Sequence, residues 1–329
     1  MPDTAGFPQM DSHGFPLGQT AEGETVLSNG VSGEVAISIC VPCFHDSADA
    51  LIATLSRMDL AARATLLLFD DGSGNPALTR LLARHMMHFP GPARLITSPD
   101  NLGRAGARNR LLALAETDWV LFLDADMRPD DDQFLVRYLD ALRAADGPAL
   151  IAGGFSLKHV KPTKETELHA AQALKSECLP ADTRAKQPGH HVFTSNILVH
   201  ADILKAVGFD AGFTGWGWED VDWGLRVAAD YPVLHIDNPA THLGLDATPA
   251  LIDKFGGSAA NFAYLAERHP DAVKQMPLWR MARGFRHLPA RPLWRGLTKA
   301  MAKTGALPLG LRLNALKTYR ALCYAEALK

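Results

Sequence analysis

Two acidic side chains, Asp124 and Asp126, follow an almost wholly apolar run from Trp119 to Leu123. A run this short, rich in large apolar side chains, is typical of a strand that is buried on both faces. The two acids come directly after the carboxyl end of that strand, which is where open α/β sheets bind ligands. Because burying an unpaired carboxylate is costly, both must face water, a cation or a hydrogen-bonding ligand. Asp-x-Asp is a short pattern, however, and an acidic turn that closes a strand explains it equally well.

Three earlier apolar runs end in polar loops in the same way, at residues 35–41, 64–69 and 93–97. The first leads to Pro42 and Phe44, the second to Asp70 and Asp71, and the third to a helical pattern that carries Arg108. Repeated strand, loop and helix predict an α/β fold with a mostly parallel sheet flanked by helices. Right-handed crossovers bring all of these loops to one edge of the sheet, where a nucleotide can bind. No Gly-x-Gly-x-x-Gly follows the first strand, which argues against a nicotinamide or flavin enzyme.

A second polar stretch, Gly215 to Arg226, combines aromatic rings, glycines and acids. Trp216 and Trp218 alternate with the glycines, and Glu219 and Asp220 follow directly. Aromatic faces beside carboxylates are typical of sugar recognition, because C–H faces stack on rings while hydroxyls bond to carboxylates. The same acids also suit the N-terminus of a helix, and the two interpretations are compatible.

Taken in order, these residues resemble family 2 glycosyltransferases of the GT-A fold. The matching elements, over roughly residues 35 to 245, are Val41-Pro42-Cys43-Phe44, Asp70-Asp71-Gly72-Ser73, Asn101-Leu102-Gly103 with Ala107-Arg108-Asn109, Asp124-Ala125-Asp126 and Glu219-Asp220. The stretch around Trp216 is also similar to the carboxyl-terminal motif of β-1,4-galactosyltransferases and chondroitin-polymerase-type domains. That pattern usually has Gly where this chain has Trp218, a departure that bears on the identity of the acceptor more than on the chemistry.

The resemblance implies a metal site. In the family the last Asp of Asp-x-Asp binds the metal, which corresponds to Asp126, while Asp124 contacts the ribose or the water shell of the metal. A His after the Glu-Asp helix is a further ligand in related enzymes, and His242 matches it better than His235. Carboxylates suit Mn²⁺ or Mg²⁺. Such an ion stabilises the negative charge that develops on a sugar-diphosphate leaving group.

The resemblance also implies how the donor nucleotide is bound. Asp70, with Asp71 beside it, would contact the uracil or the ribose, and Arg108 would contact the nucleotide or its phosphates. Pro42 and Phe44 would line the pocket for the base. Ordinary packing at strand ends remains the alternative for these residues.

The resemblance implies an inverting transfer, which needs a base on the face of the sugar opposite the leaving group. We assign this base to Asp220, with Glu219 holding the acceptor sugar and Trp216 or Trp218 stacking on it. The expected reaction moves a hexose or N-acetylhexosamine from a UDP-sugar to a hydroxyl of a glycan or glycolipid acceptor. A nucleotidyltransferase and a catalytically inactive sugar-binding module are the alternatives.

We expect three regions. Residues 1–33 lack apolar periodicity and are predicted to be disordered. Residues 34–270 form the GT-A domain, with a nucleotide-binding half at 34–145 and an acceptor half at 146–270. Residues 271–329 form a basic amphipathic helical region.

The last region is strongly cationic. From Lys274 to Lys329 the chain has twelve basic residues and one acidic residue, a formal charge of +11, although the whole chain carries −3. Basic residues with aromatics favour an interfacial segment that binds an anionic membrane surface, or a helical subdomain that packs on the core or on a second copy in a homodimer. No nucleic-acid reading motif is present, so a nucleic-acid partner is not expected. Without a signal peptide or a spanning apolar run, the protein is expected in the cytoplasm or peripherally at the inner face of the cell membrane.

Overall fold

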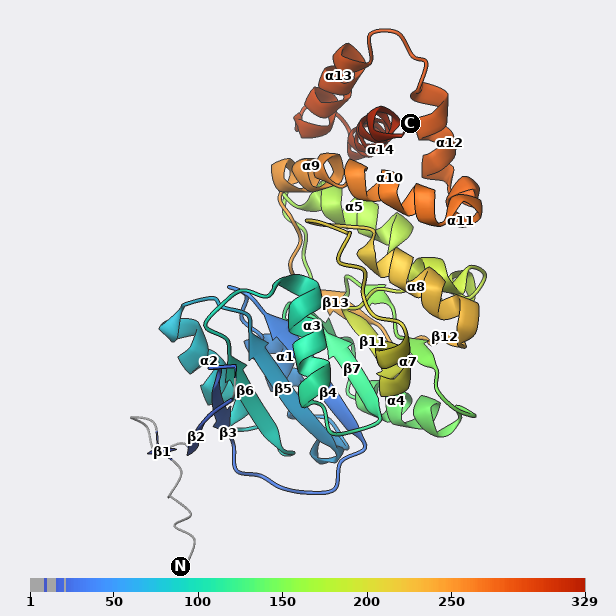
Figure 1. Cartoon of the computed structure of the whole chain (residues 1–329). Coiled ribbons are helices and arrows are strands. Elements are labelled where there is room, and N and C mark those ends of the chain that lie inside the picture. Colours follow the sequence, from blue (N-terminus) through green and yellow to red (C-terminus); the bar gives the residue numbers. More distant parts are fainter. Residues whose placement is uncertain (1–8, 11–15, 21, 329) are drawn as a thin grey trace, which may run out of the picture.

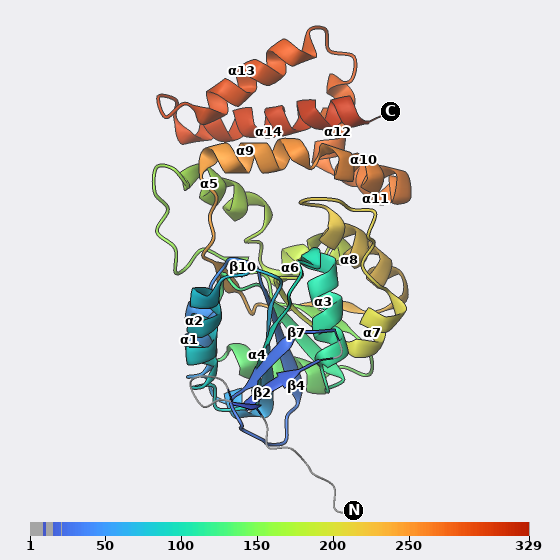
Figure 2. The same ribbon diagram turned by 60° about the vertical axis from the view of Figure 1, so that its left-hand side comes forward.

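The computed structural model describes residues 9–10, 16–20 and 22–328 of the 329-residue chain (Figure 1). Two bodies stack along the long axis of the molecule. A sheet with helices on both faces forms one, and a layer of helices from the last quarter of the chain covers one end of it (Figures 1 and 2). The prediction of a mostly parallel sheet flanked by helices, with a helical C-terminal region, is confirmed.

Four parallel strands form the centre of the large sheet, in the order β6-β5-β4-β7. They are the four apolar runs of the sequence: β4 (Ile37–Cys43), β5 (Ala64–Asp70), β6 (Ala93–Thr97) and β7 (Trp119–Leu123). Every residue of β5 is buried because β4 and β6 flank it on both sides. Cys43 pairs with Asp70, and Asp70 with Thr97. The carboxyl ends of these three strands therefore meet at one edge.

Helices cover both faces of the sheet because successive strand residues point to opposite sides. Leu66 and Leu68 belong to one apolar cluster, while Leu67 and Phe69 belong to another. The first cluster packs against α1 (Asp49–Leu55), α2 (Pro76–Met86) and α4 (Phe134–Arg143). The second packs against α3 (Gly103–Leu114), α7 (Ala201–Ala206) and α8 (Glu219–Asp230).

The prediction that residues 1–33 are disordered is wrong for their described part. The strands β1 (Gln9–Met10), β2 (Pro16–Gln19) and β3 (Thr25–Ser28) extend the sheet as antiparallel neighbours, with β3 pairing with β6. The segment is held by Glu24, which is buried and accepts two hydrogen bonds from Arg110, each at 2.7 Å. Without β3, β6 would be the edge strand of the sheet and would leave a row of backbone groups unpaired. Residues 1–8, 11–15 and 21, which the same prediction covers, lie outside the described residues.

The second half of the chain adds the other side of the sheet and a small separate sheet. β11 (Asn196–His200) runs antiparallel to both β7 and β9 (Leu150–Ala152), and β12 (Val233–His235) completes the edge. The small sheet consists of β10 (Phe155–Ser156), β13 (Ala240–His242) and β8 (Met127–Pro129). In it His242 pairs with Met127, which brings a residue from late in the chain beside the acids that follow β7.

The C-terminal helices surround α14 (Leu309–Ala327). Around it lie α5 (Glu167–Ser176), α9 (Thr248–Gly257), α10 (Ala259–Arg268), α11 (Pro270–Gln275), α12 (Pro277–Phe285) and α13 (Arg291–Lys303). Leu313, Leu316 and Tyr319 are buried against these helices, as their helical spacing indicates. This apolar core also contains Leu251 and Phe255 of α9, so the helical layer starts before the expected boundary at 271. Within the described part of the chain, no helix is long and apolar enough to cross a membrane.

The remaining helices are short and connect these elements. They are η1 (Ala61–Arg63), α6 (Ala181–Arg184) and η2 (Pro188–His191). The guanidinium of Arg184 is buried and donates to the carbonyls of Ala152, Gly153 and Ile236, at 2.8–3.1 Å. It satisfies backbone groups where β9 leaves the sheet.

A buried carboxylate joins α8 to the helical layer. Asp222 is fully buried and accepts hydrogen bonds from Arg226 Nε at 2.8 Å, Arg268 Nε at 3.1 Å and His269 Nε2 at 2.8 Å. The helix that begins at Glu219 is therefore fixed at its first turn to the end of α10.

We expect Asp222→Ala to lower the free energy of unfolding by roughly 3 kcal/mol, because two guanidiniums lose a buried carboxylate partner. As a control, Asp253→Ala removes the exposed ion pair with Lys299 and should cost less than about 1 kcal/mol. Urea unfolding of both variants measures the difference. Equal losses would contradict the anchoring role of Asp222.

Candidate active site

The acids that follow β7 meet the late histidine at the edge of the sheet. His242 Nε2 lies 2.9 Å from Asp126 Oδ2, and the two side chains remain about a quarter and a third exposed. The pairing of β13 with β8 causes this approach. His235 lies elsewhere, with Nδ1 2.7 Å from Arg184 Nη1 and Nε2 3.0 Å from the carbonyl oxygen of Pro188. The structure thus brings His242, and not His235, to Asp126.

The two partners change each other's pKa. Burial alone lowers the pKa of His242, but the hydrogen bond and charge of Asp126 outweigh it, with help from Glu177 and Asp124, so the pKa is raised. Burial raises the pKa of Asp126, but His242 outweighs that effect and lowers it. The pKa of Asp46, in the loop after β4, is raised by burial and then by the charge of Asp126.

A carboxylate is a ligand that suits Mn²⁺ or Mg²⁺, and an imidazole nitrogen is a further metal-ligand type. Among the described residues, no group of three or more His, Cys, Asp or Glu side chains is arranged to hold a metal. A two-ligand site suits ions such as Mg²⁺, which take one or two protein ligands together with phosphates of the substrate. Gly244 lies directly against the Asp126 carboxylate, and a Cβ there would collide with Oδ2. The absence of a side chain at Gly244 therefore leaves room for the carboxylate in this position.

On the side of the predicted donor site, Arg108 connects α3 to Asp124, which follows β7. It is buried, and its Nη2 lies 2.7 Å from Asp124 Oδ1, while its Nε is buried without a hydrogen-bond partner. Phe44 is 46% exposed and Pro42 is half-buried at the same edge. A flat ligand can reach the ring of Phe44.

Asp70 and Asp71 shape the loops of this edge. Asp70 is fully buried and accepts a hydrogen bond from the amide of Ser73 at 3.1 Å. Asp71, also buried, accepts one from the amide of Leu102 at 2.6 Å. Both carboxylates hold backbone amides of neighbouring loops, and their direct contact with a nucleotide stays a prediction.

On the side of the predicted acceptor site, α8 starts with its acids in the first turn. Asp220 accepts hydrogen bonds from the amide of Thr194 at 3.1 Å and from its hydroxyl at 2.9 Å. Burial raises the pKa of Asp220 to about 6, and the charge of Glu219 adds to this, while Arg108 and Thr194 act in the opposite direction. The first turn of a helix also favours negative charge.

Arg104 links the two sides, and sequence reasoning missed it. Its Nη1 lies 3.1 Å from Glu219 Oε1, and the other oxygen of Glu219 is buried without a hydrogen-bond partner. Burial lowers the pKa of Arg104, but Asp124, Glu219 and Asp220 raise it more. The available signal was the spacing of Arg104 and Arg108, four residues apart on one face of α3. Thr194 carried no such signal.

Trp216 and Trp218 contact the helical layer. Trp218 Nε1 donates to the hydroxyl of Tyr324 at 2.8 Å, and its ring packs 4.9 Å from that of Phe262. Trp216 stacks on Phe255, with 5.8 Å between ring centroids. The predicted stacking of an acceptor sugar on either ring stays a prediction, because both indoles already have protein neighbours.

The conformation of Trp218 explains why Gly is usual at this position of the motif. Its φ is +78°, in the left-handed region that favours glycine. A non-glycine residue in that region costs roughly 1–2 kcal/mol. The contacts of the indole with α10 and α14 offset that cost.

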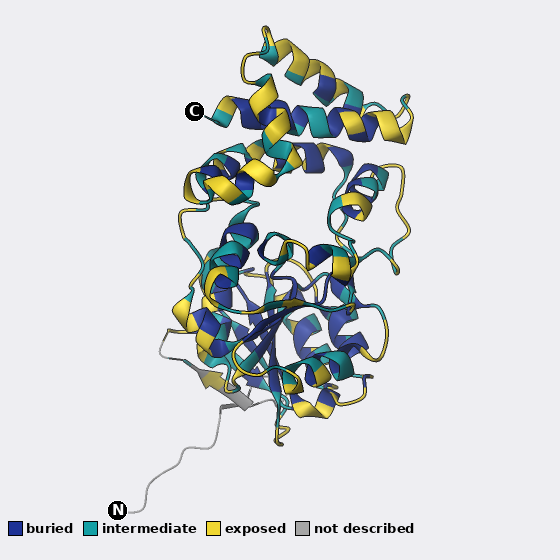
Figure 3. Ribbon diagram, turned by 90° about the vertical axis from the view of Figure 1, so that its right-hand side faces the viewer, coloured by how far each residue is buried: buried dark blue, intermediate teal, exposed yellow. Residues whose placement is uncertain are grey.

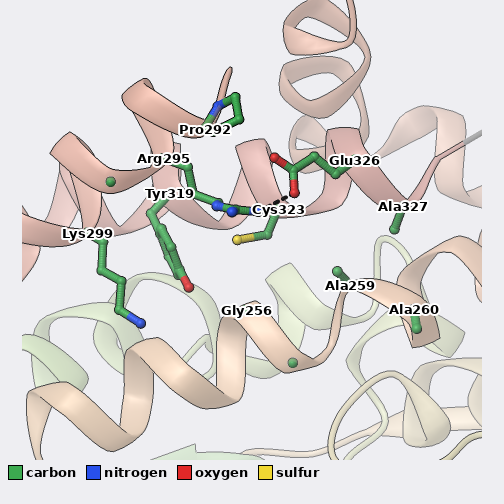
Figure 4. A pocket seen from close by; sticks show the side chains of 12 residues that line it. Gly256, Ala259, Ala260, Pro292, Arg295, Lys299, Tyr319, Cys323, Glu326 and Ala327 are labelled. Carbon is green, nitrogen blue, oxygen red and sulfur yellow. Dashed lines mark hydrogen bonds and ion pairs between the residues drawn. The ribbon is translucent and has the colours of Figure 1, made fainter. Parts of the chain in front are cut away.

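A cavity of about 760 Å³ lies away from these acids, inside the helical layer (Figure 4). Gly256, Ala259 and Ala260 form one wall, and Tyr319 and Cys323 of α14 form another. Its charged groups already have partners, since Arg295 bonds to Glu326 and Lys299 to Asp253. The cavity therefore contains no group prepared for the chemistry of the sheet edge.

The chain belongs to glycosyl transferase family 2, whose model matches residues 38–207, about half of the chain. That segment contains the four parallel strands and the acids after β7. The protein is accordingly a glycosyltransferase with a GT-A fold, and the family inferred from its motifs is confirmed.

Three known proteins show the extent of the similarity. An N-acetylglucosaminyltransferase of Sinorhizobium fredii is 28% identical over 118 residues, covering 35% of this chain and 28% of that protein. This chain thus matches less than a third of that relative's length. The mannosyltransferase PcManGT of Pyrobaculum calidifontis, in complex with GDP-Man and Mn²⁺, gives a TM-score of 0.52 at 16% identity, covering 91% of this chain and 88% of that one. TarS of S. aureus gives a TM-score of 0.51 at 13% identity, and the match covers 88% of this chain and 55% of that one. At these identities the two structures show the fold alone.

We expect Gly244→Ala to push Asp126 away from His242, because the new methyl group occupies the position of the carboxylate. The raised pKa of His242 should then fall toward its ordinary value near 6.5. NMR titration of the imidazole measures this, with Gly284→Ala as control, since a Cβ at Gly284 meets nothing within 4 Å. An unchanged His242 pKa in Gly244→Ala would contradict the close fit.

Proposed function

We propose that the protein is an inverting, metal-dependent glycosyltransferase that moves a hexose or N-acetylhexosamine from a UDP-sugar to a hydroxyl of a glycan or glycolipid. The observation that carries this proposal is Asp220, a carboxylate with a raised pKa that Thr194 holds in place. The charge of Arg108 opposes this rise in pKa, and Arg108 also bonds to Asp124 of the Asp-x-Asp motif. The proposed base and the donor-side acids therefore share Arg108 as a neighbour.

In the proposed reaction Asp220 accepts the proton of the acceptor hydroxyl. The oxygen of that hydroxyl then forms a bond to the anomeric carbon, and the bond from that carbon to the diphosphate breaks. Because Asp220 titrates near 6, it is ionised at neutral pH and still basic enough to take a proton. Glu219, at the start of the same helix, would bind acceptor hydroxyls through its carboxylate.

Arg104 and Arg108 would face the diphosphate as its negative charge grows. Asp126 and His242 would hold a Mn²⁺ or Mg²⁺ ion, which supplies Lewis-acid stabilisation to the same leaving group. Mn²⁺ is present in the mannosyltransferase complex that shares this fold. An N-acetylhexosamine is supported by the N-acetylglucosaminyltransferase relative, and uracil as the base rests on the motif resemblance.

We also propose that the protein works in the cytoplasm and peripherally at the inner face of the cell membrane, where a lipid-linked acceptor would be available. The cationic C-terminal region supports this location, since anionic lipids attract clustered Lys and Arg. A homodimer through the same region is the alternative arrangement.

Calorimetric titration of UDP tests the donor class. We expect UDP to bind with Mn²⁺ present and to lose affinity in EDTA, while GDP and ATP bind weakly. Asp126→Asn should weaken UDP binding in Mn²⁺ by at least about tenfold, because one metal ligand is lost. The control Asp253→Asn, at an exposed carboxylate in the helical layer, should behave as wild type. Binding of ATP in place of UDP would indicate a nucleotidyltransferase. If no nucleotide binds, the catalytically inactive sugar-binding module is the remaining hypothesis.

Asp220→Asn tests the base. We expect transfer to fall by roughly 10²- to 10⁴-fold while UDP and Mn²⁺ still bind.

The pH dependence of the wild type tests the same base. Its kcat/KM should fall about tenfold per pH unit below about 6, because protonated Asp220 cannot accept a proton. A raised folded-state pKa means that the ionised form destabilises the folded state above about pH 6; Asp220→Asn removes this effect together with one of the two hydrogen bonds from Thr194. Wild-type turnover in the variant would remove the assignment.

A further inference from the structure

Most cations of the C-terminal region are already bound within the protein. Arg295 and Lys299 form ion pairs with Glu326 and Asp253, and Arg312 bonds to Glu167. Arg320 lies over the ring of Phe255, 4.3 Å from its centroid. These side chains stabilise the helical layer, so their charge is not free for an external partner.

Three cations at the far end of the layer differ from these. Arg283, at the end of α12, Arg286, in the following turn, and Lys303, at the end of α13, are all exposed. None of them forms an ion pair with any residue that the structure describes. No Asp or Glu occurs between Lys274 and Glu326 to neutralise them locally.

The same part of the helical layer carries an exposed apolar stripe on α13. Leu293 is 70% exposed, Leu297 48% and Trp294 44%, and their spacing places them on one side of α13. Thr298 and Ala302, one and two turns after Trp294, are buried in the layer, so Trp294 lies at the border of the exposed side and Leu293 and Leu297 lie within it. Figures 1 and 3 show α13 at the end of the molecule farthest from the N-terminal strands, with exposed residues along much of its length.

We propose that the docking surface, made of Leu293, Trp294 and Leu297 of α13 together with Arg283, Arg286 and Lys303, binds an anionic lipid bilayer. Apolar side chains at helical spacing enter the boundary between headgroups and acyl chains, and an indole is favoured at that depth. The unpaired cations bind lipid phosphates at the same level. Charge favours an anionic occupant, because the three cations form no ion pair within the described part of the chain and would repel the same cations of a second copy.

This inference rests on the proposed peripheral location and specifies which face makes the contact. It requires no catalytic residue, so vesicle binding and UDP binding can fail independently. A protein that binds UDP but not vesicles would overturn the docking face and the proposed peripheral location, and would leave the proposed transferase mechanism standing. A protein that binds vesicles but no nucleotide would overturn only the proposed transferase mechanism.

The test is sedimentation of the full-length protein with vesicles of phosphatidylcholine, with and without phosphatidylglycerol. We expect binding to the anionic vesicles, at least about tenfold weaker binding to the neutral ones, and weakening at high salt. The triple variant Leu293→Ser, Trp294→Ala, Leu297→Ser should lose anionic binding by at least about tenfold. The triple variant Arg283→Gln, Arg286→Gln, Lys303→Gln should also lose binding to anionic vesicles by at least about tenfold.

Matched controls lie on the other body of the molecule. Leu60→Ser changes an exposed leucine, and Arg57→Gln, Arg80→Gln, Arg84→Gln removes three exposed arginines on α2 and near α1. Both controls should bind vesicles as wild type does, and all variants should bind UDP and melt as wild type does. Equal vesicle binding by all variants would overturn the proposal. So would self-association without lipid that the Leu293, Trp294 and Leu297 changes abolish, since a second copy would then cover the face.

Discussion

The organisation of this protein depends on compensating the negative charge of several carboxylates gathered at one edge of a sheet. The parallel strands deliver Asp124 and Asp126 to that edge, and α8 delivers Glu219 and Asp220. Desolvated carboxylates would otherwise take up protons, as the raised pKa of Asp220 indicates. The cations that face them are Arg108 on Asp124, Arg104 on Glu219 and His242 on Asp126. Of these four acids only Asp220 has no ion pair of its own, and its pKa is raised toward neutral pH.

The first turn of α8 separates three acids of similar sequence context into three roles. Successive residues of a helix point about 100° apart, so neighbours face different surroundings. Glu219 points to α3, Asp220 to the loop before β11, and Asp222 into the junction with α10. Three directions of attachment fix the helix in position and rotation. The placement of Asp220 thus depends on Asp222, although only Asp220 is a candidate for chemistry.

Local patterns predicted the sheet because its strands are continuous apolar runs, and they predicted the acids because these come directly after β7. They could not predict contacts that depend on distant partners. β3 reads as a polar segment, and only its pairing with β6 and the Glu24–Arg110 contact order it. Asp220 and Asp222 carry the same sequence signal, and burial among cations distinguishes them.

The aromatic and basic composition of the C-terminal region shows a similar limit. Composition cannot say which side of a helix faces the interior, and the structure separates the two sides. Trp279 and Phe285 pack on the apolar core of the layer, whereas Trp294 faces outward. The formal charge of the region likewise overstates the positive charge that is available to an external partner, because ion pairs and ring contacts within the protein engage many of its cations. An isolated surface charge is screened within about 10 Å at 0.1 M salt. Any long-range attraction therefore comes from the few unpaired cations, and apolar contact with α13 must supply most of the affinity for whatever surface it meets.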